Sequence, residues 1–123
     1  MFYKSMAAIG LLSSALATPA QAGEDPVRGA QVFRQRCGAC HSVEPGKLGM
    51  GPNLGGVMGR AAAATRFPYS PAMKNAGGVW TDPRMDAFLR APAALVRGNR
   101  MAFPGLSAAQ DRADVIAFLK GAR

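Results

Sequence analysis

The chain has 123 residues, with 15 Lys or Arg against seven Asp or Glu, so its formal net charge is +8. At this length we expect one small domain, which buries too little surface to be more than marginally stable on its own. The acidic residues are few and scattered, so no catalytic acid–base pair is evident. The basic balance favours acidic partner surfaces. Nucleic acid is the general alternative for a basic chain, but no motif supports it.

Residues 1–22 are typical of a secretory signal peptide. Lys4 supplies the positive start, residues 6–16 are apolar, and the segment ends in Ala-Gln-Ala, a small-x-small cleavage site. The apolar stretch is too short, and too rich in Ser and Gly, to span a bilayer. We therefore predict cleavage after Ala22 and a location in the periplasm. The mature domain, residues 23–123, then has no integral membrane segment.

The mature part predicts short helices joined by long Gly/Pro-rich loops, without a strand pattern. Asp25-Pro26 pairs an N-cap with a proline at the first helical position. The helix that begins there carries Ala30, Phe33 and Cys37 on one face, so we expect it to end at the cysteine-containing segment 37–41.

Two further helices are predicted to begin in the same way, at Ser70-Pro71 and Asp82-Pro83. The second of these should end before Pro92 and turn three residues inward, namely Met85, Phe88 and Leu89. Residues 107–110 (Ser-Ala-Ala-Gln) form a capping-box pattern that predicts a terminal helix. Two loops remain, residues 42–69 and 91–106, and loops of this length are usually functional.

Cys37-Gly38-Ala39-Cys40-His41 is a C-x-x-C-H motif, which is typical of covalent attachment of a c-type haem. These are the only two cysteines and the only histidine in the chain. A thioredoxin-like redox pair would need a βαβ pattern, and a structural zinc site would need two more ligands. A plain disulfide would leave the adjoining histidine unexplained. The motif therefore predicts one haem c, held by Cys37 and Cys40, with His41 on its iron.

A single histidine leaves methionine, water or nothing as the second axial ligand of the iron. Met101 lies in a loop about sixty residues beyond His41, which is enough chain to cross to the other face of the haem. Thioether sulfur would raise the reduction potential into the range of an electron carrier. The general alternative for any methionine is core packing. The other candidates in the mature chain are Met50, Met58, Met73 and Met85.

Four more residues are candidates for the surroundings of the haem. The carbonyl of Pro52 could accept a hydrogen bond from His41, since a ligating histidine usually donates its second ring N–H. The alternative is an ordinary turn proline. Arg60, Tyr69 and Trp80 could partner buried propionates, because a buried carboxylate needs hydrogen bonds. By composition alone they are equally plausible as surface or core residues.

Several motifs resemble those of class I cytochromes c, the family of mitochondrial cytochrome c and bacterial cytochromes c2 and c550. Gly29 and Phe33 precede the C-x-x-C-H motif, GPNLGGVMGR follows at residues 51–60, and MAFPGL begins at Met101. Tyr69, Trp80 and Pro92 lie between them in the family's order, and DVIAFL begins at Asp114 near the end. The resemblance covers nearly all of residues 24–121. It implies an all-α cytochrome c fold, in which short helices and long loops wrap around one covalently bound haem.

The resemblance also implies a role for each matching residue. Cys37 and Cys40 would be the thioether anchors, and His41 and Met101 the two iron ligands. Pro52 would accept the hydrogen bond of the histidine, and propionate partners would be Arg60, Tyr69 and Trp80. Where the first and last helices cross, Gly29 and Phe33 would pack against Val115 and Phe118.

Three positions depart from the pattern of the family. Phe88 stands where a tyrosine often bonds the methionine sulfur, and Met73 stands where an asparagine is common near the propionates. The loop before Met101 begins Arg97-Gly98 rather than Pro-Gly, so we expect a more mobile loop.

The sequence therefore predicts a soluble periplasmic electron carrier, monomeric and not an enzyme, that passes one electron between respiratory or dehydrogenase partners through acidic docking surfaces. The arginines near the haem-binding segments could ring the exposed haem edge, namely Arg34, Arg36, Arg97 and Arg100. The alternative for each of them is an evenly distributed, solvated charge. Two alternatives remain. One is the haem c subunit of a larger periplasmic oxidoreductase complex, and the other is a haem sensor or peroxidase with an open coordination position.

Overall fold

The computed structural model describes residues 10–14 and 23–123. Most of the predicted signal peptide, including its cleavage site, lies outside this part of the chain. The described residues form helices joined by long loops, with one isolated bridge between Ala61 and Val79 and no strand. This confirms the all-α prediction. The helices are α1 Pro26–Arg36, α2 Pro71–Ala76, α3 Asp82–Arg90, α4 Pro92–Leu95 and α5 Ala109–Gly121. None of the helices in the described ranges is long and apolar enough to cross a membrane.

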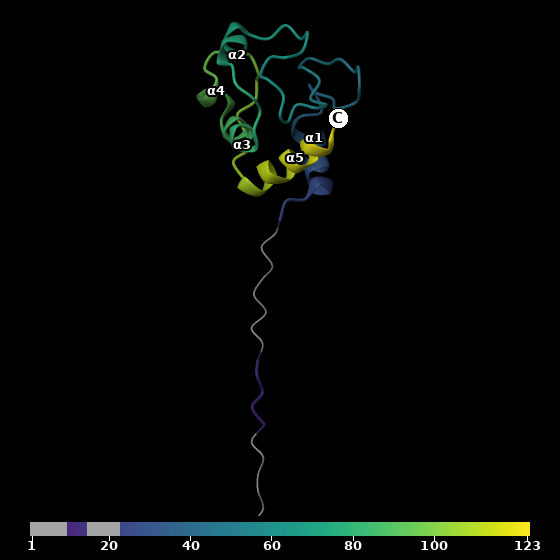
Figure 1. Cartoon of the computed structure of the whole chain (residues 1–123), viewed down its shortest axis with the longest axis vertical. Coiled ribbons are helices and arrows are strands. Elements are labelled where there is room, and N and C mark those ends of the chain that lie inside the picture. The colour runs from purple at the N-terminus through teal and green to yellow at the C-terminus, as the bar shows by residue number, and fades with distance from the viewer. Residues whose placement is uncertain (1–9, 15–22) are drawn as a thin grey trace, which may run out of the picture.

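Helices α1 and α5 cross at the base of the molecule (Figure 1), and a glycine lies at the crossing. A Cβ on Gly29 would overlap the backbone carbonyl of Asp114. Only glycine therefore allows α1 and α5 to approach this closely. Beside this contact the rings of Phe33 and Phe118 pack with their centroids 5.3 Å apart. The predicted packing of the first helix on the last is confirmed.

A buried carboxylate braces the same crossing. Asp114 is completely buried, and accepts hydrogen bonds from an Arg28 guanidinium nitrogen at 2.6 Å and from the Asp25 N–H at 2.9 Å. Gln110 Nε2 donates a third bond at 2.8 Å. Burial by itself would raise the pKa of Asp114, but these hydrogen bonds, led by that of Arg28, hold the pKa below its ordinary value. The charged carboxylate therefore ties the start of α1 to α5.

Two of the predicted helix starts are confirmed. The side chain of Asp25 accepts the N–H groups of Val27 and Arg28, and the hydroxyl of Ser70 accepts the N–H of Met73. The third prediction is wrong by one residue. Thr81 caps α3 by accepting the Arg84 N–H at 3.3 Å, so Asp82 is the first helical residue.

The predicted capping box before α5 is wrong. The helix begins at Ala109, and its N-cap, Ala108, makes no side-chain cap. Gln110, the partner that Ser107 would need, turns instead to Asp114 and to the carbonyl of Gly23. The carbonyl of Ser107 is taken by the buried Arg112 at 2.9 Å. Other hydrogen bonds, two of them within five residues along the chain and one to the distant Gly23, have replaced the reciprocal bonds of the box.

Helix α1 ends at segment 37–41 as predicted, with Cys37 as its C-cap, and α3 ends at Arg90, before Pro92. The predicted loop 91–106 needs a correction, because it opens with one helical turn, α4. The expected inward residues of α3, Met85, Phe88 and Leu89, are all buried.

Helices α2, α3 and α4 lie on one side of the molecule, and the loop that follows α1 lies on the other (Figure 1). That loop is fixed to the end of α5, because the Gly56 N–H donates to the carbonyl of Ala122 at 2.7 Å. The two sides enclose the cavity described next.

Candidate functional site

The C-x-x-C-H segment folds back on itself directly after α1. The Cys40 and His41 N–H groups both donate to the carbonyl of Cys37, at 3.1 and 3.0 Å. The two cysteines are not joined in a disulfide; Cys37 is half-buried and Cys40 is exposed. Burial raises the pKa of the Cys37 thiol to about 11, although the nearby charge of Arg36 opposes the shift. The segment presents both sulfurs and the imidazole to one cavity.

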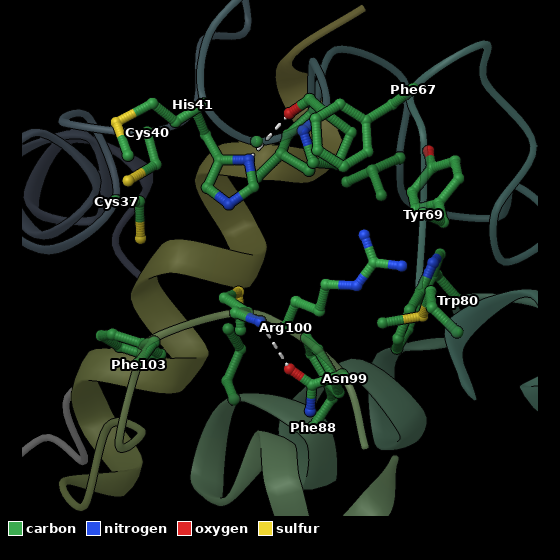
Figure 2. Close-up of a pocket in the computed structure, with 18 of the residues that line it drawn as sticks. Cys37, Cys40, His41, Phe67, Tyr69, Trp80, Phe88, Asn99, Arg100 and Phe103 are labelled. Carbon is green, nitrogen blue, oxygen red and sulfur yellow. Dashed lines mark hydrogen bonds between the residues drawn. The ribbon is translucent and has the colours of Figure 1, made fainter. Parts of the chain in front are cut away.

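His41 is held in a fixed orientation from behind. Its Nδ1 lies 2.7 Å from the carbonyl oxygen of Pro52, the acceptor that the sequence suggested. With Nδ1–H as donor, Nε2 is left facing the cavity (Figure 2). A Cβ on Gly51 would lie 2.5 Å from His41 Cε1, so the chain passes tightly behind the ring. Gly51 itself donates its N–H to the carbonyl of Cys40 at 2.9 Å.

The cavity in front of His41 has a volume of about 560 Å³ and a mainly apolar wall. Figure 2 shows Phe67, Tyr69, Trp80 and Phe88 opposite the two cysteines. Together these walls and the paired sulfurs suit a large flat apolar group with reactive vinyl edges. A ligand site of this kind is expected to be concave and apolar, with few polar groups.

The wall of the cavity also holds a donor for a carboxylate. Arg60 lines the cavity and donates to the carbonyls of Gly55 and Asn53, at 3.0 and 3.3 Å, yet its buried Nε has no partner in the described chain. A buried N–H without an acceptor destabilises the fold, so we expect a bound group to supply a hydrogen-bond acceptor to Arg60 Nε. Tyr69 bonds Thr65 through their hydroxyls at 2.6 Å, and Trp80 packs on Phe88 at 4.9 Å. The unpartnered Nε of Arg60 thus fits a group that carries a carboxylate, whereas the contacts of Tyr69 and Trp80 by themselves assign them no such role.

The side of the cavity away from Pro52 is formed by the loop that carries Met101. Asn99 shapes this loop, because its Oδ1 accepts the Met101 N–H at 2.9 Å while its Nδ2 donates to the Val96 carbonyl at 2.8 Å. Asn99 was not singled out from the sequence, although an Asn two residues before the candidate ligand is a known turn pattern.

Four methionines line the cavity, so proximity alone does not select the ligand. Met85 is buried in the core and Met50 is exposed on the side of Pro52. Met73 projects from α2 and Met101 from the loop, both half-buried. Met58, the fifth candidate, packs against the core instead.

The arginines expected around the haem edge divide into two pairs. Arg36 and Arg100 line the cavity, and Figure 2 shows the guanidinium of Arg100 directed into it. Arg34 and Arg97 do not line it.

Comparisons with known proteins agree with this architecture. The family model described as Cytochrome c matches residues 26–123. A cytochrome c2 of Rhodomicrobium vannielii is 47% identical over 115 residues, which cover 90% of this chain and 91% of that protein. A cytochrome c of Theileria annulata is 43% identical over 99 residues, covering 80% and 86% of the two chains. The cytochrome c-type cyt cy of Rhodobacter capsulatus is 48% identical over 102 residues, 82% of this chain and 51% of that protein.

A small all-α domain with a C-x-x-C-H turn facing an apolar cavity defines a class of proteins that bind haem covalently and transfer electrons. The chain belongs to the cytochrome c family. It is therefore an electron-transfer protein and not an enzyme, and its cofactor is haem c attached through Cys37 and Cys40.

Proposed function

We propose that the protein is a soluble periplasmic carrier of single electrons, whose haem iron is bound by His41 on one side and Met101 on the other. The observation that carries the proposal is the 2.7 Å contact between His41 Nδ1 and the Pro52 carbonyl. A hydrogen bond there fixes the tautomer and leaves Nε2 free for a metal. The haem supplies a one-electron change at its iron, and the polypeptide supplies binding and orientation.

The residues of the chain would divide that work. His41 is oriented by Pro52 and confined by Gly51, while Asn99 fixes the backbone of Met101. Arg60 Nε, with Tyr69 and Trp80, would serve the propionates. Phe88 is apolar, so it offers no hydrogen bond to a methionine sulfur, and the loop geometry set by Asn99 has to hold that ligand.

The distribution of charge supports acidic docking partners. Residues 45–81 and 87–110 contain no Asp or Glu, and they form most of the cavity wall. Most of the acidic side chains pair with bases elsewhere: Asp111 and Asp114 with Arg28, Asp86 with Arg112, Asp82 with Lys120, and Glu44 with Lys47. The face around the cavity is thus cationic, which would steer an anionic partner surface toward it.

Periplasmic location rests on the pattern of residues 1–22 and on thioether attachment to free thiols. The test is to purify the native protein from the periplasmic fraction and record spectra of both redox states. We expect haem absorption, a ferric band near the red edge of the visible that indicates thioether ligation, and a mature chain that begins at Gly23. Size-exclusion chromatography should give a monomer. Elution with a larger partner would favour a permanent subunit, and a missing red band would contradict Met101 ligation.

A further inference from the structure

The loop that carries Met101 is anchored firmly at both ends. Asn99 ties its start to the carbonyl of Val96 at the end of α4. At the other end the Leu106 N–H donates to the Leu89 carbonyl at 2.7 Å, and Leu106 is buried with 1% of its surface exposed. Between these anchors, three of residues 100–105 are exposed, namely those at 100, 102 and 104.

One side chain of α1 crosses to this middle section. The guanidinium carbon of Arg36 lies 5.5 Å from the centre of the Phe103 ring, within the range of a cation–π contact. Arg36 Nη2 also makes a long hydrogen bond of 3.4 Å to the carbonyl of Gly105. In the described residues, the cation–π contact and the hydrogen bond between α1 and residues 100–105 are therefore both made by Arg36.

The acceptor of that hydrogen bond is itself fixed. Gly105 has φ +114°, and a Cβ there would overlap the carbonyl of Arg90 at the end of α3. Its backbone is therefore pressed against α3 in a conformation that only glycine adopts readily. Arg36 reaches from α1 to a rigid point and, on the way, covers the ring of Phe103.

This contact lies beside the attachment site. Arg36 directly precedes Cys37, and Arg36, Cys37, Met101 and Phe103 line the same cavity. In Figure 2, Phe103 lies on the side of the cavity where Cys37 is found. A contact at this point joins the element that bears the first sulfur to the loop that bears the thioether.

We propose that Arg36 is a positioning residue that latches the Met101 loop onto α1 and so limits how often the distal side of the iron opens. The proposal rests on Met101 ligation, which is part of the proposed function. Arg36 acts through Phe103 and Gly105 and does not touch the iron. The alternative is that Arg36 is only a solvated charge, as an exposed arginine usually is.

Imidazole binding to the ferric protein measures this opening. An external ligand binds only when Met101 has left, so its apparent Kd equals the intrinsic Kd divided by the open fraction. Arg36→Met keeps the length and apolar stem of the side chain but removes the charge and the donors. We expect it to bind imidazole about threefold to tenfold more tightly than the wild type, as the loss of one exposed cation–π contact and one weak hydrogen bond implies.

The chain offers a matched control in Arg34, which is exposed on the same helix and whose side chain makes no hydrogen bond or ion pair in the described residues. Arg34→Met changes the net charge equally and should leave the imidazole Kd unchanged. Arg36→Lys retains a cation over the ring without the planar guanidinium, so it should restore part of the wild-type affinity. The loss of the red ferric band on addition of imidazole is the readout.

A double-mutant cycle tests the partner. Phe103→Leu should also tighten imidazole binding. In the variant that carries both Arg36→Met and Phe103→Leu, the fold-decrease in the imidazole Kd should be smaller than the product of the two single fold-decreases. Fully multiplicative effects would overturn the proposal, as would an Arg36→Met Kd equal to that of Arg34→Met.

Failure of the ligand assignment is distinguishable from failure of the latch. If the wild type lacks the red band and Met101→Ala leaves the imidazole Kd unchanged, Met101 is not the ligand and the latch falls with it. If the band is present, Met101→Ala tightens binding and Arg36→Met does not, the ligand assignment stands and the latch alone is wrong.

Discussion

Gly51 passes behind His41 so closely that a methyl group on its Cα would lie 2.5 Å from the imidazole Cε1. The hydrogen bond from His41 to Pro52, the next residue, depends on this approach. We expect Gly51→Ala to displace the ring and destabilise the haem protein by about 1–3 kcal/mol, as overpacking usually does. Urea unfolding followed by haem absorption measures the change. Gly121→Ala is the control, since a Cβ there meets no atom within 4 Å, and equal effects of the two variants would contradict the prediction.

Two half-buried methionines, Met101 and Met73, line the cavity, and the proposed function assigns only Met101 as the iron ligand. Met101→Ala should abolish the red ferric band and lower the reduction potential, because thioether ligation favours the reduced iron. Met73→Leu should retain the band, since Leu preserves the volume of a packing residue. Visible spectra and a potentiometric titration of both purified proteins are the measurements. Loss of the band in Met73→Leu alone would move the ligand to α2.

The loop before Met101 begins Arg97-Gly98 and lacks the stiffening proline of the family, so the two hydrogen bonds of Asn99 have to fix its start. Asn99→Ala removes the bonds to the Met101 N–H and to the Val96 carbonyl, each worth about 0.5–1.5 kcal/mol. We expect the red band to disappear at a lower urea concentration than in the wild type, ahead of global unfolding measured by far-UV circular dichroism. Asn75→Ala, at an exposed position of α2, is the control. If both variants lose the band where the wild type does, Asn99 does not hold the loop.

Asp114 predicts a specific response to acid. Its pKa is lowered in the folded state, so it contributes stability above the ordinary pKa of an aspartate, near 4, and loses this contribution as pH falls toward the folded-state value. Asp114→Asn should lower the free energy of unfolding at pH 7 by about 1–3 kcal/mol, the usual worth of hydrogen bonds to a charged group. It should also flatten the fall in stability below pH 4. Urea titrations at several pH values test both.

The control for that prediction is Asp111→Asn. Asp111 pairs with the same Arg28, but its side chain remains 27% exposed. Solvent screens such a pair, so the loss should stay under about 1 kcal/mol. If Asp111→Asn lost more free energy of unfolding than Asp114→Asn, Asp111 rather than Asp114 would be the carboxylate that braces the crossing of α1 and α5.

The cationic face predicts a dependence on the charge of small redox reagents. At low ionic strength an anionic metal complex should oxidise the protein faster than a cationic complex of similar potential, and added salt should narrow the difference. Arg100→Gln should slow the anionic reagent more than Arg123→Gln does, because Arg100 lines the cavity. Stopped-flow rates at several salt concentrations measure this. Rates that are independent of salt would remove the steering argument.

Local sequence signals predicted much of the fold because three of its helices, α1 to α3, begin with a capping side chain and a proline in the first two helical positions. Asp25 and Ser70 cap as expected, because no tertiary partner competes for their side chains. The box at Ser107 failed because Gln110 instead donates to Asp114, one turn further along α5, and to the carbonyl of Gly23 across the molecule. A pattern of four residues contains no information about such partners.

The attachment motif and the acceptor of His41 were predictable because they lie within a dozen residues of one another. The contact of Arg36 with Phe103 was not, since the two positions are far apart in the chain and neither belongs to a periodic pattern. The unsatisfied Nε of Arg60 likewise becomes visible only when its other two nitrogens have been assigned to carbonyls.

The bond from Gly56 to Ala122 has a consequence for the order of assembly. Until α5 folds against the loop that follows α1, that loop lacks this hydrogen bond, and the segment behind the imidazole is less constrained. Docking of the C-terminal helix would then complete the enclosure of the haem.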